Sequence, residues 1–336
     1  MNIFYRWTQK IYLLCLCFLL PACVHLNEED KQPLAITDNL SVEEAVTIAT
    51  TQGGESILQF RKWLRKQNNE LAVEQLLFTK LDSQYAQMPY HILINTCKLY
   101  VDLRGHKAPQ LFLRFVESNN KFIREMGWFL ASTIPSATMA QAIDKVLSNA
   151  LENNEIEEVL LPKMADAVTV NHLYSAYTFV RQGLFEQNHA AFASAMATLA
   201  PRRAADDFMD YLALAPIEEL RQLNLRAIDT LSCSIMLKHM LDYPPSLAHR
   251  EFKQLFYFSI SRNTLLAEAA QRVLETFLPE HKQYLASMLA SMPAWSQLAF
   301  VEASRHRMTP SMGFFLAELQ KTTGQKDVLE EIQEIR

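Results

Sequence analysis

Apolar residues recur at helical spacing along almost the whole chain from Ser41 onward, and this pattern constrains the fold more than any other feature. One predicted buried face is formed by Leu266, Ala270, Val273 and Phe277. A second predicted buried stripe consists of Phe122, Met126 and Phe129. The 336 residues include only 7 glycines, and no Asn-Gly or Asp-Gly pair lies between alternating apolar residues. The sequence therefore predicts an all-α protein.

Capping residues and prolines predict where several helices begin and end. Ser41 and Glu44 have the spacing of a capping box, and Gly53-Gly54 is expected to end the helix that follows it. Thr309 is a predicted N-cap. Proline is tolerated in the first turn of a helix, where its missing amide hydrogen is not needed. The prolines expected at helix starts are Pro109, Pro135, Pro216, Pro279, Pro293 and Pro310.

Two segments, 118–130 and 261–274, share a further pattern. Each has a polar turn, an apolar pair, a charged residue, a small residue and then more apolar residues, and the small residues are Gly127 and Ala270. This order resembles the second helix of HEAT-type repeats, in which a small residue allows close stacking. The resemblance implies an irregular α-solenoid of HEAT-like helical hairpins. A compact multi-helix bundle is the alternative, because no strict repeat period is visible.

The N-terminus has the pattern of an export signal. Arg6 and Lys10 precede an uncharged apolar run over residues 11–20, which is shorter than the ~20 residues that span a bilayer. The run ends in Leu20-Pro21-Ala22-Cys23, which resembles the lipobox of bacterial lipoproteins, although Pro21 is unusual there. An ordinary secretory signal and an uncleaved membrane anchor are the alternatives.

The lipoprotein resemblance implies cleavage before Cys23 and acyl chains on that cysteine. Val24 stands where an aspartate commonly retains such proteins in the inner membrane, so we expect the periplasmic face of the outer membrane. Residues 1–22 are then the signal peptide, and residues 23–40 are the lipidated cysteine with a flexible tether. Residues 41–336 form the helical, repeat-like body. Two or more acyl chains anchor a protein stably, whereas one chain does not.

Charge and cysteine content limit the partners. The chain has a net charge of −5, and removal of Arg6 and Lys10 leaves 30 of its 32 basic residues against 37 acidic ones, a net charge of −7. Such a chain has no general attraction to nucleic acid. Cys97 and Cys233 are the cysteines that follow Cys23. They are expected either to form one disulfide in an oxidising compartment or to be buried free thiols.

No catalytic or metal-binding motif is present. The chain lacks a Gly-rich phosphate loop and a Gly-x-Ser-x-Gly elbow, and its 9 histidines are too scattered for a zinc helix. Glu55-Ser56 and Glu117-Ser118 match only the dipeptide of lytic transglycosylases, without the stretch that follows it in that family. We therefore expect no enzyme, no cofactor and no metal.

Three weaker features have structural explanations. Arg202-Arg203 and Asp206-Asp207 are spaced for two i, i+4 ion pairs on an exposed helix face rather than for a binding ridge. Arg305-His306-Arg307 is a small basic patch near a predicted helix end, where an anion contact is the alternative. The run 255–258, Leu-Phe-Tyr-Phe, predicts a helix that is covered on all sides rather than a ligand wall.

A helical repeat body without reactive residues favours protein binding. We expect an outer-membrane lipoprotein that serves as a non-enzymatic scaffold or accessory subunit of an envelope complex, such as a secretion-system core complex. An activator of a peptidoglycan synthase and a carrier of a hydrophobic ligand are the alternatives. A peptidoglycan hydrolase is the remaining hypothesis.

Overall fold

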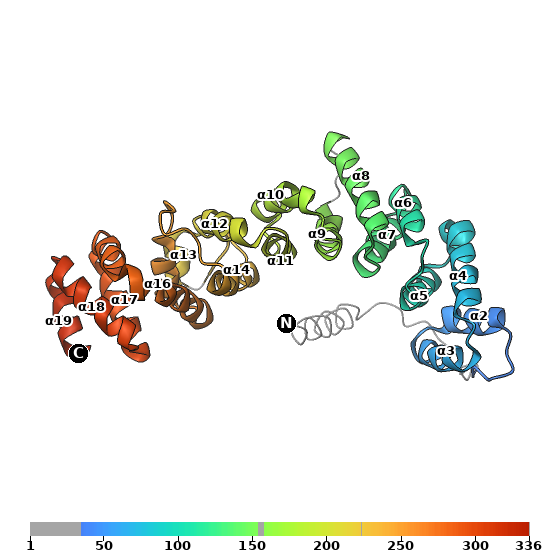
Figure 1. Ribbon diagram of the computed structural model, residues 1–336, viewed down its shortest axis with the longest axis horizontal. Coiled ribbons are helices and arrows are strands. Elements are labelled where there is room, and N and C mark those ends of the chain that lie inside the picture. Colours follow the sequence, from blue (N-terminus) through green and yellow to red (C-terminus); the bar gives the residue numbers. More distant parts are fainter. Residues whose placement is uncertain (1–34, 154–157, 223, 336) are drawn as a thin grey trace.

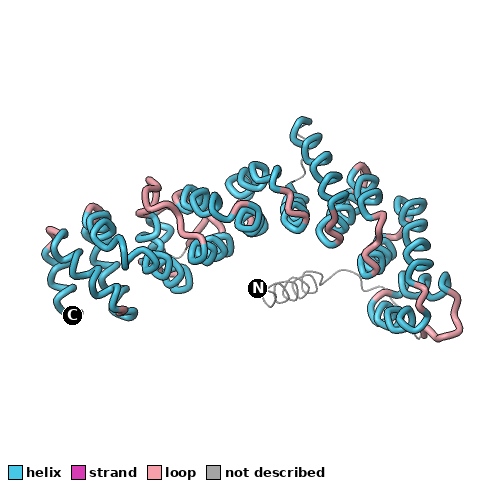
Figure 2. Tube along the Cα trace, viewed as in Figure 1, coloured by secondary structure: helices cyan, strands magenta, loops and turns pink. Residues whose placement is uncertain are grey.

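The helices form an extended, curved row in the computed structural model, which describes residues 35–153, 158–222 and 224–335 (Figure 1). Within these ranges the chain is helical with connecting loops, and no strand occurs (Figure 2). The all-α prediction is therefore confirmed. The predicted signal peptide and Cys23 lie outside the described residues.

Antiparallel helix pairs build the row in two layers. On the concave side, successive helices pack on one another: α5 (Tyr90–Asp102), α7 (Lys121–Thr133), α9 (Leu161–Val170), α11 (Ala190–Leu199), α14 (Thr230–Asp242) and α16 (Thr264–Ala290), with α18 (Pro310–Thr322) next to α16. The outer layer contains α4 (Glu70–Gln84), α6 (Ala108–Val116), α8 (Ala137–Asn153), α10 (Tyr177–Gln187), α12 (Pro201–Leu212), α15 (Gln254–Ser259) and α17 (Ala294–Ser304). The remaining helices are α2 (Val42–Gln52) and α3 (Gly54–Gln67) at one end, the short α13 (Ile217–Gln222), and α19 (Lys326–Ile335) at the other end.

Side-chain hydrogen bonds join neighbouring helix pairs at a nearly constant distance in sequence. The amide nitrogen of Asn171 donates to the carbonyl of Ala131, 40 residues earlier, at 2.8 Å. Gln254 donates to the carbonyl of Leu212, 42 residues earlier, at 3.0 Å. HEAT and armadillo repeats are about 40–47 residues long. The spacing is therefore that of two-helix repeats stacked in a solenoid, a regularity that the sequence alone does not display.

The helix ends that were predicted from capping residues are present in the structure. The Ser41 hydroxyl accepts from the Glu44 amide at 3.3 Å, and the Glu44 carboxylate accepts from the Ser41 amide at 2.9 Å, so the capping box is confirmed. Gly53 ends α2 with a φ of 67°, a conformation that favours glycine. The Thr309 hydroxyl caps α18 by accepting from the Met312 amide at 3.2 Å.

The predicted helix start at Pro279 is wrong. Pro279 lies inside α16, and the backbone leaves helical geometry at His281, where φ is −121°. Proline removes one intrahelical hydrogen bond and bends the helix, so the chain continues across a kink instead of turning back.

The two predicted buried stripes have different outcomes. Leu266, Ala270 and Val273 are buried, and Phe277 packs partly buried against the core, as predicted. Phe122, in contrast, is 51% exposed. The buried face of α7 is rotated from the predicted stripe and consists of Ile123, Met126, Gly127, Trp128, Leu130 and Ala131.

Gly127 occupies a close helix crossing, but within its own pair. A Cβ atom at this position would lie 3.1 Å from both Phe115 Cβ and Val116 Cγ1. Both neighbours belong to α6. The small residue therefore allows the two helices of one pair to pack closely, and it does not lie between one repeat and the next. The prediction of a fully covered helix over 255–258 is confirmed, because every residue of α15 is buried.

Candidate functional site

Asp166 lies on the partly exposed face of α9, a helix on the concave side of the row. The buried residues of α9 include Met164 and Val168, which share one helix face. Asp166 is midway between them in sequence and therefore points to the opposite side. It is nevertheless only partly exposed. It forms no hydrogen bond or ion pair with any residue in the described part of the chain.

Burial raises the pKa of Asp166 from 3.8 to about 6. The neighbouring acidic residue on α7, Glu125, has a basic partner, because it pairs with Lys163 of α9 at 3.1 Å. Lys163 is thus engaged with α7 and leaves Asp166 without a cation. A desolvated carboxylate that lacks a partner is unfavourable for folding, and such groups are enriched at functional sites.

The helix next to α9 offers an open, uncharged surface. The partly exposed residues Ala190, Ser194 and Ala197 of α11 recur at i, i+4 and i+7, and the rest of this face carries no long side chain. On the other side, α7 presents Phe129 together with Ser132. The small side chains of α11 beside this half-buried carboxylate leave room for a segment of another protein that carries a basic residue. We take this region of α7, α9 and α11 as the candidate site and call it the inner face.

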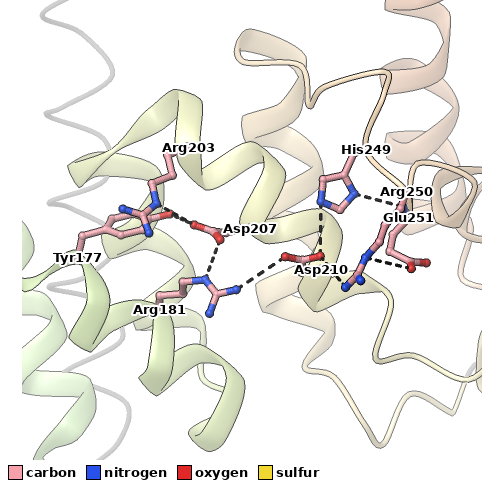
Figure 3. A network of polar contacts seen from close by, with 8 residues as sticks. All are labelled: Tyr177, Arg181, Arg203, Asp207, Asp210, His249, Arg250 and Glu251. Carbon is pink, nitrogen blue, oxygen red and sulfur yellow. Dashed lines mark hydrogen bonds and ion pairs between the residues drawn. The ribbon is translucent and has the colours of Figure 1, made fainter.

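A separate cluster of charges connects helices of the outer layer (Figure 3). Asp207 of α12 is its centre, with a side chain only 14% exposed. The Tyr177 hydroxyl donates to Asp207 Oδ2 at 2.6 Å, and Arg181 Nε donates to Oδ1 at 2.7 Å, both from α10. The guanidinium of Arg203 lies 4.6 Å from the centroid of the Tyr177 ring and 3.5 Å from Asp207.

Asp210, one helical turn further along α12, extends the cluster towards the next repeat (Figure 3). It lies 3.7 Å from Arg181 Nη2, 3.4 Å from His249 Nε2 and 3.8 Å from Arg250 Nη2. The amide of Glu251 donates to His249 Nδ1 at 3.2 Å, which orients the imidazole. Each acid is compensated by several cations of the same chain, so this cluster braces one repeat against the next.

The predicted pair of i, i+4 salt bridges is half present. Arg203 and Asp207 are paired as expected. Asp206 instead accepts from the backbone amide of Ser246 at 2.7 Å, 40 residues away, so the predicted pair with Arg202 is wrong. Stacking of the next repeat supplies a backbone donor that a single helix cannot offer.

The basic patch at 305–307 is compensated within the chain. Arg305 pairs with Glu331 at 2.6 Å, and Arg307 pairs with Glu268 at 2.6 Å. These contacts tie α19 and α16 to the turn after α17. The patch therefore acts as a structural joint.

Cys97 and Cys233 do not form a disulfide. Both thiols are free and buried, one in α5 and the other in α14, which lie in different repeats (Figure 1). Burial raises the pKa of both thiols, which keeps them protonated and unreactive. Of the two sequence-based alternatives, the buried free thiol is the one observed.

The remaining candidates gain no supporting partners. Glu55 and Glu117 are both exposed, on α3 and at the end of α6. Among the described residues, no three His, Cys, Asp or Glu side chains gather as metal ligands would. A shallow cavity of about 260 Å³ lies between the turn before α8 and the end of α9. The backbone amide of Ser136 donates a hydrogen bond to Asn171 Oδ1 there, at 3.2 Å. None of the described helices combines the length and apolar character needed to cross a bilayer.

Sequence reasoning did not select the inner face, although signals for it are present. Asp166 is the single acidic residue of α9, whose sequence is LPKMADAVTV. The sequence of α11, AAFASAMATL, has no charged residue. Neither signal identifies a site until the stacking of the repeats places the two helices side by side.

No protein-family model, curated protein sequence or solved structure matches this chain.

Proposed function

We propose that this chain is a lipid-anchored scaffold protein of the bacterial outer membrane. In this proposal Cys23 carries the acyl chains, and the helical row holds another envelope protein on its concave side without catalysing a reaction. The observation that carries the proposal is Asp166, a half-buried carboxylate without a partner among the described residues, next to the small, uncharged face of α11. A basic residue of a bound protein supplies the missing charge.

The shape of the molecule supports this proposal. A row of stacked two-helix repeats presents an extended concave surface, which proteins of this architecture use for binding (Figure 1). The small side chains of Ala190, Ser194 and Ala197 allow a partner helix or strand to approach α11 closely. The charge cluster around Asp207, in contrast, is already satisfied within the chain, which favours the inner face over the outer layer as the binding surface.

The anchor is tested by Cys23→Ser. The thiol sulfur accepts the diacylglyceryl group in bacterial lipoproteins. We therefore expect this variant to incorporate no labelled palmitate and to keep its signal peptide uncleaved. Cys97→Ser is the matched control, because its buried thiol is not expected to accept lipid. Palmitate incorporation into the Cys23→Ser variant rules out the proposed anchor.

The binding surface is tested by Asp166→Asn. Because the carboxyl pKa is raised in the folded chain, the folded state is favoured when the group is protonated. The destabilising contribution of Asp166 is absent well below pH 3.8, grows as the pH rises and is complete above about pH 6. The amide removes this penalty, so we expect the variant to be more stable by about 1–3 kcal/mol at neutral pH and unchanged in acid. Denaturant melts at the two pH values measure the difference.

The same variant should lose crosslinks to envelope proteins that the wild-type chain forms in native membranes. Glu302→Gln, an exposed residue on α17, is the control and should alter neither stability nor crosslinks. A gain in stability with a loss of binding identifies a residue kept for function at the expense of stability. If Asp166→Asn destabilises the chain and leaves the crosslinks intact, Asp166 has a structural role and the inner face is not the binding surface.

A further inference from the structure

The helix α3 carries a positive surface on a chain that is negative overall. Its sequence contains four basic residues, Arg61, Lys62, Arg65 and Lys66, and one acidic residue, Glu55. The whole chain, in comparison, has a net charge of −5. The helix α3 is therefore locally positive, although the net charge of the whole chain is negative.

The exposed face of α3 combines this charge with an apolar residue. The helix buries Ile57, Phe60, Trp63 and Leu64. Leu58, Lys62 and Arg65 recur at i, i+4 and i+7 on the opposite face, where Leu58 is 52% exposed. A leucine flanked by basic side chains on one face of a helix is the pattern of segments that lie on a lipid surface.

Among the described residues, the two basic residues at the centre of this face have no acidic partner, whereas those at its edges do. Arg61 donates to both carboxylate oxygens of Asp102, at 2.7 and 2.8 Å. Lys66 contacts Asp38 at 3.2 Å. Lys62 and Arg65 form no ion pair with any residue that the structure describes. Their charges remain available for an external anion.

The chain that leads towards Cys23 leaves the body along this helix. Residues 35–40 precede α2, and the amide of Ile36 donates to Gln59 of α3 at 3.3 Å. Gln67 of α3 donates to the carbonyl of Asp38 at 3.0 Å. Twelve residues lie between Cys23 and Ile36, and the thirteen steps from one Cα atom to the next span at most about 45 Å in an extended chain. An anchor at Cys23 therefore holds α3 close to the membrane, at the terminal position that Figure 1 shows for this helix.

We propose that the exposed face of α3 binds the anionic phospholipid headgroups of the membrane that holds the acyl anchor. Leu58 enters the boundary between headgroups and acyl chains, while Lys62 and Arg65 contact lipid phosphates. The contact orients the row of repeats relative to the membrane. This inference rests on the proposed lipid anchor and adds a second attachment, since one end of the body then binds the bilayer directly.

The test uses the full lipidated chain, purified from membranes and reconstituted into vesicles of phosphatidylethanolamine with or without phosphatidylglycerol. A fluorophore is attached at Leu58→Cys or, as a control, at Phe314→Cys on α18 near the other end. Nitroxide-labelled headgroups quench a fluorophore that touches the lipid surface. We expect quenching at position 58 in vesicles that contain phosphatidylglycerol, and little at position 314 or in vesicles without anionic lipid.

Charge reversal tests the two free basic residues. Lys62→Glu with Arg65→Glu should lower the ratio of contacting to free orientations at least about 30-fold, because each basic residue near an anionic surface contributes about a factor of five. Lys145→Glu with Arg262→Glu changes the net charge equally at exposed positions elsewhere and should have no effect.

Flotation of the vesicles separates the two proposals. A chain that does not float with any vesicle refutes the anchor and, with it, the contact of α3. A chain that floats but shows equal quenching at positions 58 and 314, or quenching that charge reversal does not change, overturns only the contact of α3.

Discussion

Gly183→Ala is expected to destabilise the folded chain by about 2 kcal/mol or more, the upper part of the range for overpacked cores. A Cβ atom at this position would lie 2.3 Å from Phe192 Cε1 and 2.6 Å from two further atoms of the same ring. Phe192 belongs to α11 and is fully buried, so its ring has no free space into which to move. The backbones of α10 and α11 must separate instead, and the loss appears as a lower midpoint in a denaturant melt.

Gly313→Ala is the matched control, because Gly313 also lies within a helix. A Cβ atom there has no heavy atom within 4 Å apart from the helix itself. Alanine is favoured over glycine in a helix by about 1 kcal/mol, so this variant should be slightly more stable than the wild type. Equal effects at the two positions would contradict the close packing of α10 on α11.

Asn188→Ala is expected to cost about 2–4 kcal/mol, because it breaks a joint between repeats and strains the backbone. Asn188 ends α10 in the left-handed conformation, with a φ of 52°. Its side-chain oxygen accepts from the hydroxyl of the buried Tyr211 and, at 2.6 Å, from the amide of Asp229. Alanine removes this acceptor and leaves the buried hydroxyl without a carbonyl partner.

Asn68→Ala separates the two contributions. Asn68 ends α3 in the same conformation, with a φ of 53°, but lies on an exposed turn and caps the helix through its backbone alone. This variant should therefore lose about 1 kcal/mol of unfolding free energy, which is the cost of placing alanine in the left-handed conformation. Thermal or denaturant unfolding of both variants gives the difference. If Asn188→Ala lowers the free energy of unfolding no more than Asn68→Ala does, the side-chain hydrogen bonds of Asn188 do not stabilise the contact between repeats.

The sequence by itself determined the helices and many of their ends. The capping box of Ser41 and Glu44, the end of α2 at Gly53 and the cap at Thr309 were all predictable. These features depend on contacts between residues no more than four positions apart, so a single segment contains all the information. Sequence reasoning also predicted the burial of α15, because apolar residues on every side of a helix require cover on every side.

The tertiary structure decided how the helices face one another and which polar groups meet. It exposed Phe122, and it placed Gly127 against α6 of its own pair instead of against the next repeat, where the sequence pattern had predicted it. It gave Asp206 a backbone partner 40 residues away in place of Arg202. It also left Asp166 half-buried and, within the described ranges, without a partner, between neighbours that belong to other helices. Each of these outcomes depends on contacts between different helices, and such contacts have no signature within a single helix.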